Sequence, residues 1–214
     1  RKVFLSDQGI WKLKVSNAAG KDEKELLVKI REPISILKEP QDKNVIIGHK
    51  VMFDVQTSGV NPTFQWKYNG KNIEGAVRSS YLIQEANSTN LGEYQVLVKN
   101  EFSTVLSSIA RLKLLYPVSF TVQPKNMIVR EGQPFQLSIK INGTQPFNFQ
   151  WYKNGIEIPG AISSVYQIGK ASKLNAGQYS VTANNPAGIP AISSFAKIDI
   201  LIPPTVSDIE IKQG

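Results

Sequence analysis

The chain of 214 residues contains no cysteine. This absence excludes a disulfide framework, catalysis by a thiol and every metal site built on thiolate ligands. Secreted domains of this size often carry a disulfide, so the hydrophobic core is expected to contain a substitute for one. Histidine is almost as scarce, and the single one, His49, has no partner at the spacing of a catalytic triad or a zinc site. We therefore expect no cofactor and no catalytic or metal-binding residue.

Long apolar runs are also missing. The longest are only as long as a strand, such as residues 112–116 with Lys113 inside, so no membrane insertion is expected. The net charge of +8 is spread along the chain instead of gathering in one patch, which argues against nucleic acid as a partner. The densest acidic group, residues 22–25, alternates with lysine and lacks the oxygen spacing of a calcium loop.

One short motif, Asp/Asn-x-Gly-x-aromatic, occurs three times, at residues 7–11, 90–94 and 175–179. Trp66 precedes Tyr94 by 28 residues, and Trp151 precedes Tyr179 by the same 28. A fixed period of this kind indicates structural repeats. The polar residue that opens each motif is expected to hold its turn by hydrogen bonds to nearby backbone, as Asx residues do. These residues are Asp7, Asn90 and Asn175.

Every second residue is apolar in the segments around these landmarks, as a half-buried strand requires. The clearest segments are 51–55, 94–98, 135–139 and 179–183. Asn-Gly pairs at 69–70 and 154–155 punctuate the pattern as turn signals. Since no stretch shows a helical period, the sequence predicts an all-β fold.

Together these landmarks resemble the immunoglobulin superfamily, and most closely its intermediate sets. In that family a Trp on one strand packs against an inter-sheet disulfide, and a Tyr lies two residues before the second Cys. Trp66 and Trp151 match the first position, and Tyr94 and Tyr179 match the second. The resemblance implies tandem immunoglobulin-like β-sandwiches without disulfides. A fibronectin type III fold fits less well, because it places its Trp on an earlier strand and lacks the Asp/Asn-x-Gly-x-Tyr motif.

The resemblance also identifies the core positions that hold Cys elsewhere in the family. They are Val55 and Val96 in one repeat and Ile139 and Val181 in the next. We expect an apolar contact within each pair to replace the disulfide. A disulfide typically contributes about 2–4 kcal/mol, and burial of one branched aliphatic side chain contributes roughly 1.5–3 kcal/mol. Two buried aliphatic residues are therefore an adequate substitute.

A second likeness concerns the source. Residues 69–76 and 154–161 both read Asn-Gly-x-x-Ile-x-Gly-Ala. With residues 15–20, these runs resemble the cysteine-free repeats of large bacterial surface and secreted proteins. Muscle repeats of the titin type share the Trp and Tyr landmarks but usually lack the Gly-Ala run. The likeness therefore implies a bacterial source.

The period divides the chain into two complete repeats and two partial ones. We expect residues 1–32 to be the C-terminal part of one repeat, strands E to G, and residues 33–116 to be a complete domain. We expect residues 117–203 to be a second complete domain and residues 204–214 to be the first strand of a further repeat. Prolines mark the three joints, at Pro33, Pro117 and the pair 203–204, without any Gly/Ser stretch. Joints of this composition predict semi-rigid stacking of repeats in a longer array.

These observations predict a non-enzymatic structural and adhesive segment of a large cell-surface or secreted protein, acting as a semi-rigid spacer. Its expected partners are other immunoglobulin-like repeats of the same chain and, beyond them, surface proteins or glycans. Phe102, in a turn where binding residues of sandwiches concentrate, is the one candidate contact. The alternatives are a carbohydrate- or protein-binding module of a secreted enzyme or phage particle, and an intracellular scaffold of the muscle type.

Overall fold

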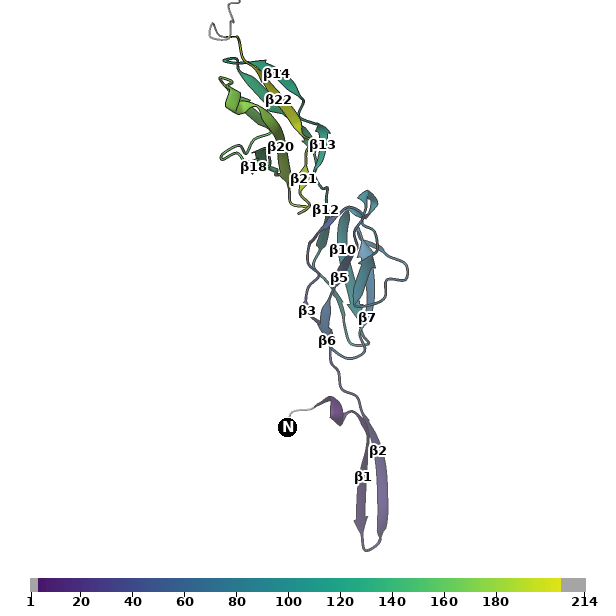
Figure 1. The fold of residues 1–214 in the computed structure, drawn as a ribbon. Coiled ribbons are helices and arrows are strands. Elements are labelled where there is room, and N and C mark those ends of the chain that lie inside the picture. Colours follow the sequence, from purple (N-terminus) through teal and green to yellow (C-terminus); the bar gives the residue numbers. More distant parts are fainter. Residues whose placement is uncertain (1–3, 205–214) are drawn as a thin grey trace, which may run out of the picture. The chain divides into compact units, whose positions relative to one another are not determined.

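The computed structural model of the protein describes residues 4–204. Along the chain, Figure 1 shows a hairpin, a first β-sandwich and a second β-sandwich. The fold is all-β, which confirms the class predicted from the alternating pattern. Within the described residues, helical structure is confined to single 3₁₀ turns that open the three repeated motifs. These turns are η1 (Leu5–Asp7), η2 (Ser88–Asn90) and η3 (Lys173–Asn175).

The N-terminal hairpin consists of β1 (Gly9–Asn17) and β2 (Gly20–Val28), paired antiparallel over their full length. Because side chains alternate along a strand, its two faces differ. One face carries Trp11, Leu13 and Val15, all exposed. The other face carries a ladder of ion pairs, Lys12 with Glu23 (3.4 Å) and Glu25 (2.7 Å), and Lys14 with Glu23 (2.8 Å). The two faces of β1 are therefore mainly apolar and mainly charged, while across the hairpin Asp22 and Lys24 lie on the first face and Ile10 and Leu27 on the second.

The first sandwich is built from two layers. Its larger sheet has the order β4-β12-β10-β7-β8, with β11 also beside β10, while β5 pairs with β9 and β3 with β6. The strands are β3 (Ser35–Lys38), β4 (Lys43–Ile46), β5 (Val51–Asp54), β6 (Gln56–Ser58), β7 (Thr63–Tyr68), β8 (Lys71–Asn72), β9 (Ser80–Ile83), β10 (Gly92–Lys99), β11 (Thr104–Leu106) and β12 (Ala110–Leu115).

The inner face of β10 shows how alternation builds this core. Tyr94, Val96 and Val98 are buried on one side of the strand, and the residues between them are not. The Tyr94 ring stacks on Phe53 of β5, with centroids 4.5 Å apart, and lies 6.0 Å from the ring of Tyr81 on β9. The β5–β9 pair therefore covers the inner face of β10.

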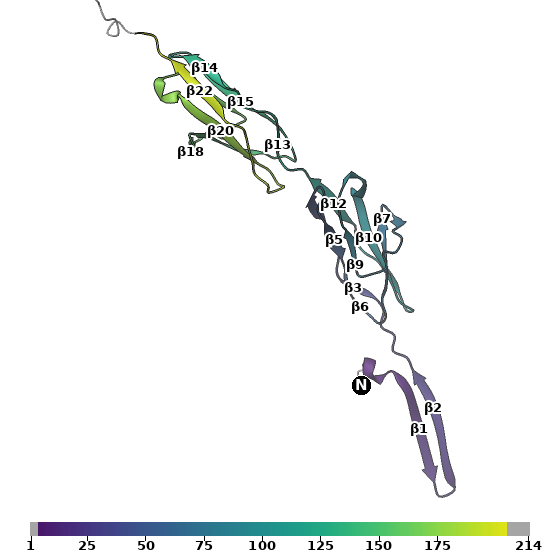
Figure 2. The same ribbon diagram turned by 45° about the vertical axis from the view of Figure 1, so that its right-hand side comes forward.

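The second sandwich repeats this plan. Its larger sheet has the order β14-β22-β20-β17-β18, with β21 beside β20, and the other layer holds the pairs β15–β19 and β13–β16. Figure 2 shows β22 and β20 side by side. The strands are β13 (Ser119–Val122), β14 (Met127–Arg130), β15 (Phe135–Ser138), β16 (Lys140–Asn142), β17 (Asn148–Lys153), β18 (Ile156–Glu157), β19 (Val165–Ile168), β20 (Gly177–Asn184), β21 (Ala191–Ile192) and β22 (Ala196–Leu201). Strand β14 runs parallel to β22. The pairs of β20 with β17, β21 and β22 are all antiparallel.

A fully buried tryptophan lies at the centre of each sandwich. The indole N–H of Trp66 donates to the carbonyl of Arg78 (2.9 Å), and that of Trp151 donates to the carbonyl of Ser163 (2.8 Å). The eight residues predicted for the core are all buried, namely Val55, Trp66, Tyr94, Val96, Ile139, Trp151, Tyr179 and Val181. In the second sandwich, Ile139 and Val181 belong to one cluster of buried side chains. The direct contacts expected in place of the disulfides stay a prediction.

Buried serines accompany the aliphatic residues at these positions. The Oγ of Ser107 accepts a hydrogen bond from the backbone N–H of Val96 (2.9 Å), and the Oγ of Ser193 accepts one from Val181 (3.0 Å). An unpaired N–H in a core is costly, so each serine satisfies a donor that the strand ladder leaves open. This role of the serines was not predicted from the sequence.

The predicted domain limits enclose these strands. The strands of the sandwiches run from Ser35 to Leu115 and from Ser119 to Leu201, inside the expected ranges 33–116 and 117–203. The limits themselves stay predictions. The strand expected at 204–214 lies outside the described residues apart from Pro204. So do residues 1–3, at the start of the partial repeat 1–32.

Candidate functional site

The three repeated motifs form the same corner. In each copy, the ring of the aromatic residue donates to the backbone carbonyl four residues earlier, at 2.8 Å: Tyr94 to Asn90, Tyr179 to Asn175 and Trp11 to Asp7. The predicted role of the opening polar residue is confirmed, because its side-chain oxygen accepts a backbone N–H three residues earlier: Asn90 from Asn87, Asn175 from Ser172 and Asp7 from Phe4. An indole N–H therefore does at Trp11 what a phenol O–H does at the other corners.

Burial makes these phenols hard to ionise. It raises the pKa of Tyr179 from 10.0 to about 12, with a smaller contribution from Tyr166, and it also raises the pKa of Tyr94. A raised folded-state pKa means that the native state holds the proton more tightly than the unfolded chain does. The stability that depends on the neutral phenol is therefore complete below pH 10 and is lost as the pH rises toward 12.

We expect the free energy of unfolding of the second sandwich to fall by about 1.4 kcal/mol per pH unit between pH 10 and 12 through Tyr179. Denaturant titrations at several pH values measure this slope. Tyr179→Phe is the control. It should lower stability at pH 7 by about 1 kcal/mol through the lost hydrogen bond and remove this part of the slope. Equal slopes for the variant and the parent protein would contradict the expectation.

The same polar arrangement recurs where each sandwich begins. Asn100 donates from its side-chain amide to the carbonyls of Glu32 (2.8 Å) and Val60 (3.0 Å). Asn185 does the same with the carbonyls of Tyr116 (2.7 Å) and Thr144 (2.9 Å). Each asparagine thus binds a linker residue three positions before the first strand of its sandwich, and the turn between β6 and β7 or between β16 and β17. We call this arrangement the linker clamp.

The other end of each amide organises the turn after β10 or β20. Asn100 Oδ1 accepts from the N–H groups of Phe102 (3.0 Å) and Ser103 (2.9 Å), and Asn185 Oδ1 accepts from Ala187 (3.1 Å). One buried or half-buried side chain therefore links three segments that are far apart in the sequence. Amide groups supply donors and an acceptor at once, which is the reason that asparagine suits this position.

Glycine allows the turn to approach the linker closely. At Gly59, with φ +103°, an added Cβ would lie 2.8 Å from the carbonyl oxygen of Pro33. At Gly143, with φ +142°, it would lie 2.9 Å from Nδ2 of Asn185 and 3.0 Å from the carbonyl oxygen of Pro117. A side chain at Gly143 would therefore collide with the clamp residue Asn185, and a side chain at Gly59 would collide with the linker at Pro33 and Ile34.

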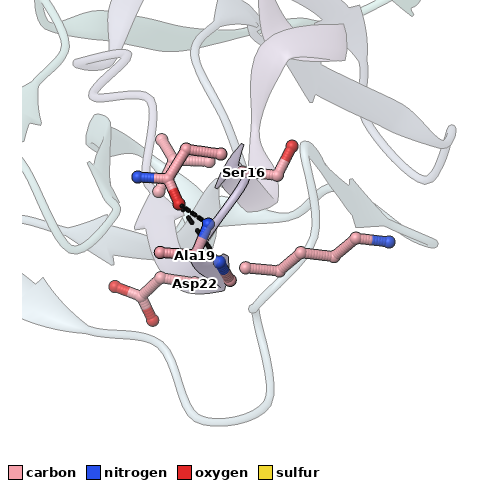
Figure 3. Close-up of a pocket in the computed structure, with 7 residues that line it drawn as sticks. Ser16, Ala19 and Asp22 are labelled. Carbon is pink, nitrogen blue, oxygen red and sulfur yellow. Dashed lines mark hydrogen bonds between the residues drawn. The ribbon is translucent and has the colours of Figure 1, made fainter.

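A third asparagine occupies the same place in the hairpin. Asn17, Asn100 and Asn185 each follow the aromatic residue of their motif by six positions. Asn17 Oδ1 accepts from the N–H groups of Ala19 (2.8 Å) and Gly20 (3.1 Å), as Figure 3 shows for the turn around Ala19. The shallow hollow at this turn is lined by Val15, Ser16, Asn17, Ala19, Gly20, Lys21 and Asp22.

The predicted contact residue, Phe102, is half-buried, and its N–H donates to Oδ1 of the clamp residue Asn100. Its role in binding a partner stays a prediction. Among residues 4–204, no group of three or more His, Cys, Asp or Glu side chains is placed to hold a metal ion. No helix in the same range has the length and apolar character needed to span a bilayer. Sequence reasoning missed the clamp, although the constant spacing of the three asparagines was a usable signal.

Comparisons with known proteins agree with this geometry. The model of the immunoglobulin I-set domain matches residues 34–113, and that of an immunoglobulin domain matches residues 117–185. Mouse hemicentin-1 is 25% identical over 221 residues, which cover 97% of this chain and 4% of hemicentin-1. The muscle M-line assembly protein unc-89 of Caenorhabditis elegans is 28% identical over 225 residues, which cover 92% of this chain and 3% of unc-89. The chain thus spans only a few per cent of the length of these curated relatives.

A solved structure of Sidekick-1 immunoglobulin domains 1–4 has a TM-score of 0.68 and 17% identity, and the match covers 93% of this chain and 60% of that one. At this identity the likeness concerns the fold alone.

The relatives are animal proteins, so the bacterial source expected from the Asn-Gly and Gly-Ala runs is wrong. The structure explains why the runs misled. Asn69, Gly70 and Gly75 have φ values of 48°, 79° and 71°, and their counterparts in the second sandwich are alike. Tight hairpin turns need such left-handed residues, which Asn and Gly adopt most readily. The runs therefore encode turn geometry, and any sandwich with these turns can carry them.

The two domain matches, the tandem sandwiches and the repeated corners together show that this cysteine-free chain belongs to the immunoglobulin superfamily.

Proposed function

We propose that the tandem domains form a non-enzymatic structural and adhesive segment of a larger animal protein, in which they act as a semi-rigid spacer. The observation that carries the proposal is the linker clamp. Strand β12 ends at Leu115, and the carbonyl of the very next residue, Tyr116, is bound by Asn185. The N–H of Tyr116 also donates to Thr144 Oγ1 (2.8 Å). The residue that follows β12 is therefore hydrogen-bonded to the second sandwich through both its N–H and its carbonyl.

A spacer of this kind needs joints that resist bending, and its partners are neighbouring repeats of the same type. The same clamp binds Glu32 through Asn100 at the start of the first sandwich, so the device recurs at successive joints. Likeness to hemicentin-1, of which this chain spans 4%, supports a role as one segment of a much longer protein. We place the protein outside the cell or at its surface.

The joint is tested by Asn185→Asp. The change keeps the Oδ1 acceptor for Ala187 but replaces the amide donor with a charged oxygen facing the carbonyls of Tyr116 and Thr144. Leaving such groups unpaired costs about 1–3 kcal/mol. We expect the second sandwich to lose stability by that amount in denaturant titrations. Small-angle scattering is expected to show a wider distribution of maximum dimensions than for the parent chain.

Asn184→Asp provides the matched control. Asn184 is adjacent and exposed, and its Oδ1 accepts the N–H of Asn185 (2.8 Å), a bond that aspartate preserves. This variant is expected to leave both stability and scattering unchanged. If the parent chain itself scattered as two freely jointed bodies, or if Asn185→Asp left its scattering unaltered, the spacer proposal would fail.

An intracellular scaffold of the muscle type is the second candidate. The observation that favours it is the likeness to the muscle M-line assembly protein unc-89 along 92% of the chain. Fractionation of the source tissue with an antibody against the two domains separates the candidates. Recovery with the contractile apparatus supports the scaffold, and recovery from the extracellular matrix or cell surface supports the adhesive segment.

A further inference from the structure

The turn between β9 and β10 carries an acceptor sequence that the spacer role leaves unexplained. Asparagine followed two positions later by Ser or Thr, with any residue but Pro between them, accepts an N-linked glycan in secreted proteins. This pattern occurs twice in the sequence, at residues 87–89 and 142–144. A third Asn-x-Thr run, at residues 61–63, is excluded because its middle residue is Pro62. The fold places the two acceptor sequences in different surroundings.

The first acceptor sequence lies on the surface of the first sandwich. Asn87 is the N-cap of the turn η2, and Asn87, Ser88 and Thr89 are all exposed. Oδ1 of Asn87 accepts hydrogen bonds from the N–H of Thr89 (2.9 Å) and from its hydroxyl (2.6 Å). The two side chains that define the acceptor sequence are therefore in direct contact with each other and accessible from solvent.

The atom that would carry the glycan, Nδ2 of Asn87, contributes little to the turn. Its hydrogen bond to the carbonyl of Glu85 is long, at 3.5 Å. The cap depends instead on Oδ1 of Asn87 and on Oδ1 of Asn90, which accepts the backbone N–H of Asn87 (2.9 Å). A carboxamide nitrogen has two hydrogens, so it keeps one after glycosylation, and its oxygen is unchanged. A glycan at this position therefore leaves the hydrogen bonds of the cap intact.

The equivalent turn of the second sandwich shows that the fold does not require asparagine here. Ser172 takes the place of Asn87 before η3, and Asn175 Oδ1 accepts its N–H at 2.8 Å. Leu174 occupies the position of Thr89. Because the same 3₁₀ turn forms with and without the acceptor sequence, the turn geometry alone does not account for Asn-Ser-Thr in the first sandwich.

The second acceptor sequence is engaged in the linker clamp. Thr144 Oγ1 accepts the N–H of Tyr116 (2.8 Å), and the N–H of Thr144 donates to the carbonyl of Tyr116 (2.9 Å). The carbonyl of Thr144 accepts from Asn185 (2.9 Å). Asn142 itself is exposed, but its threonine is held by the linker, whereas Thr89 is bonded to its own asparagine.

We propose that Asn87 is a site of N-linked glycosylation and that it is used in preference to Asn142. The donor is an oligosaccharide linked to a lipid pyrophosphate. A bond forms between Nδ2 of Asn87 and the anomeric carbon of the first sugar, and the bond from that carbon to the phosphate oxygen breaks. The lipid pyrophosphate leaves with the bonding electron pair, and Nδ2 gives up one proton to the solvent. The inference rests on the proposed extracellular location, because this transfer takes place in the secretory pathway.

Expression of the 214-residue chain in animal cells behind a secretory signal peptide tests the acceptor sequence by itself. An amidase that releases N-linked glycans converts the glycosylated asparagine to aspartate, so mass spectrometry of peptides reads Asn87 and Asn142 separately. We expect conversion at Asn87 and a smaller converted fraction at Asn142. An Asn87 that is never converted would overturn the proposal and leave the spacer role untouched. A converted fraction at Asn142 that equals or exceeds that at Asn87 would refute the preference.

Three variants separate the glycan from the turn. Asn87→Asp keeps the Oδ1 acceptor of the cap and lacks Nδ2, so it should lose the glycan while the first sandwich stays folded. Thr89→Val removes the hydroxyl and should also lose the glycan, whereas Thr89→Ser keeps a hydroxyl and should retain it. A glycan that persists at position 87 in Thr89→Val, or that is lost in Thr89→Ser, would contradict the role assigned to the hydroxyl.

The native protein distinguishes failure of this inference from failure of the proposed function. A glycan at Asn87 in protein isolated from the source tissue supports both. Native protein without the glycan, beside a secreted 214-residue chain that carries it, would show that the acceptor works but that the protein does not enter the secretory pathway. That result would overturn both the native glycan and the extracellular location, and it would favour the intracellular scaffold.

Discussion

Replacing Trp66 with alanine is expected to unfold the first sandwich and leave the second folded. The indole is completely buried, and its N–H is satisfied by the carbonyl of Arg78. Its ring also packs near Phe53 and Tyr81, with centroids 6.2 and 6.3 Å apart. Truncation of a buried Trp typically costs about 3–5 kcal/mol, and the total stability of a domain is only about 5–15 kcal/mol. Calorimetry should show that the unfolding transition of the first sandwich moves to a much lower temperature or disappears.

Trp11→Ala is the matched control for this prediction. Trp11 is half-exposed and belongs to the hairpin, so its removal is expected to leave the transitions of both sandwiches in the 214-residue chain unchanged. A small effect of Trp66→Ala, comparable to that of Trp11→Ala, would contradict the assignment of Trp66 as the centre of the core. Trp151→Ala should produce the converse result, with the second sandwich lost and the first retained.

The second large effect is expected from restoring the cross-link that the family usually carries. In the double variant Val55→Cys/Val96→Cys, we expect a disulfide to form and to raise the free energy of unfolding of the first sandwich by about 2–4 kcal/mol. The physical reason is the loss of conformational freedom in the unfolded chain between the two positions. Denaturant titration of the oxidised and reduced forms measures the difference directly.

The control moves one cysteine by a single position. Leu97 follows Val96 on β10 and points to the opposite face of the strand, because side chains alternate. Val55→Cys/Leu97→Cys is therefore expected to remain reduced under the same conditions. If the pair at 55 and 96 failed to oxidise, or if oxidation lowered stability, the two valines would not face each other, and the proposed replacement of the disulfide would be wrong.

Features encoded by local pattern were predictable from the sequence. The alternation around Tyr94 and Tyr179 determines which side of each strand is apolar, and burial of that side follows from the hydrophobic effect. The roles of Asn90 and Asn175 were also predictable, because each bonds to backbone only three residues away. The period of the Trp and Tyr landmarks then implied the sandwich.

Features encoded by distant contacts were not predictable in the same way. The bond from Asn100 to Glu32 joins residues 68 positions apart, and that from Asn185 to Tyr116 joins residues 69 apart. Their constant spacing of six residues from the aromatic residue of the motif marks these asparagines, but it does not indicate which distant carbonyls they bind. Phe102 shows the same limit. Its place in a turn suggested a contact residue, but the fold leaves its side chain half-buried.

The parallel pair β14–β22 has a mechanical consequence. The ladder runs from Met127 opposite Ile198 to Arg130 opposite Leu201, so an early and the final strand of the second sandwich lie side by side in the same direction. Tension applied to the two ends of this sandwich pulls these neighbours along their length in opposite senses. The hydrogen bonds between them then bear the load together in shear instead of opening one after another. A spacer built from such units would yield to stretching by abrupt rupture of whole sandwiches, one at a time.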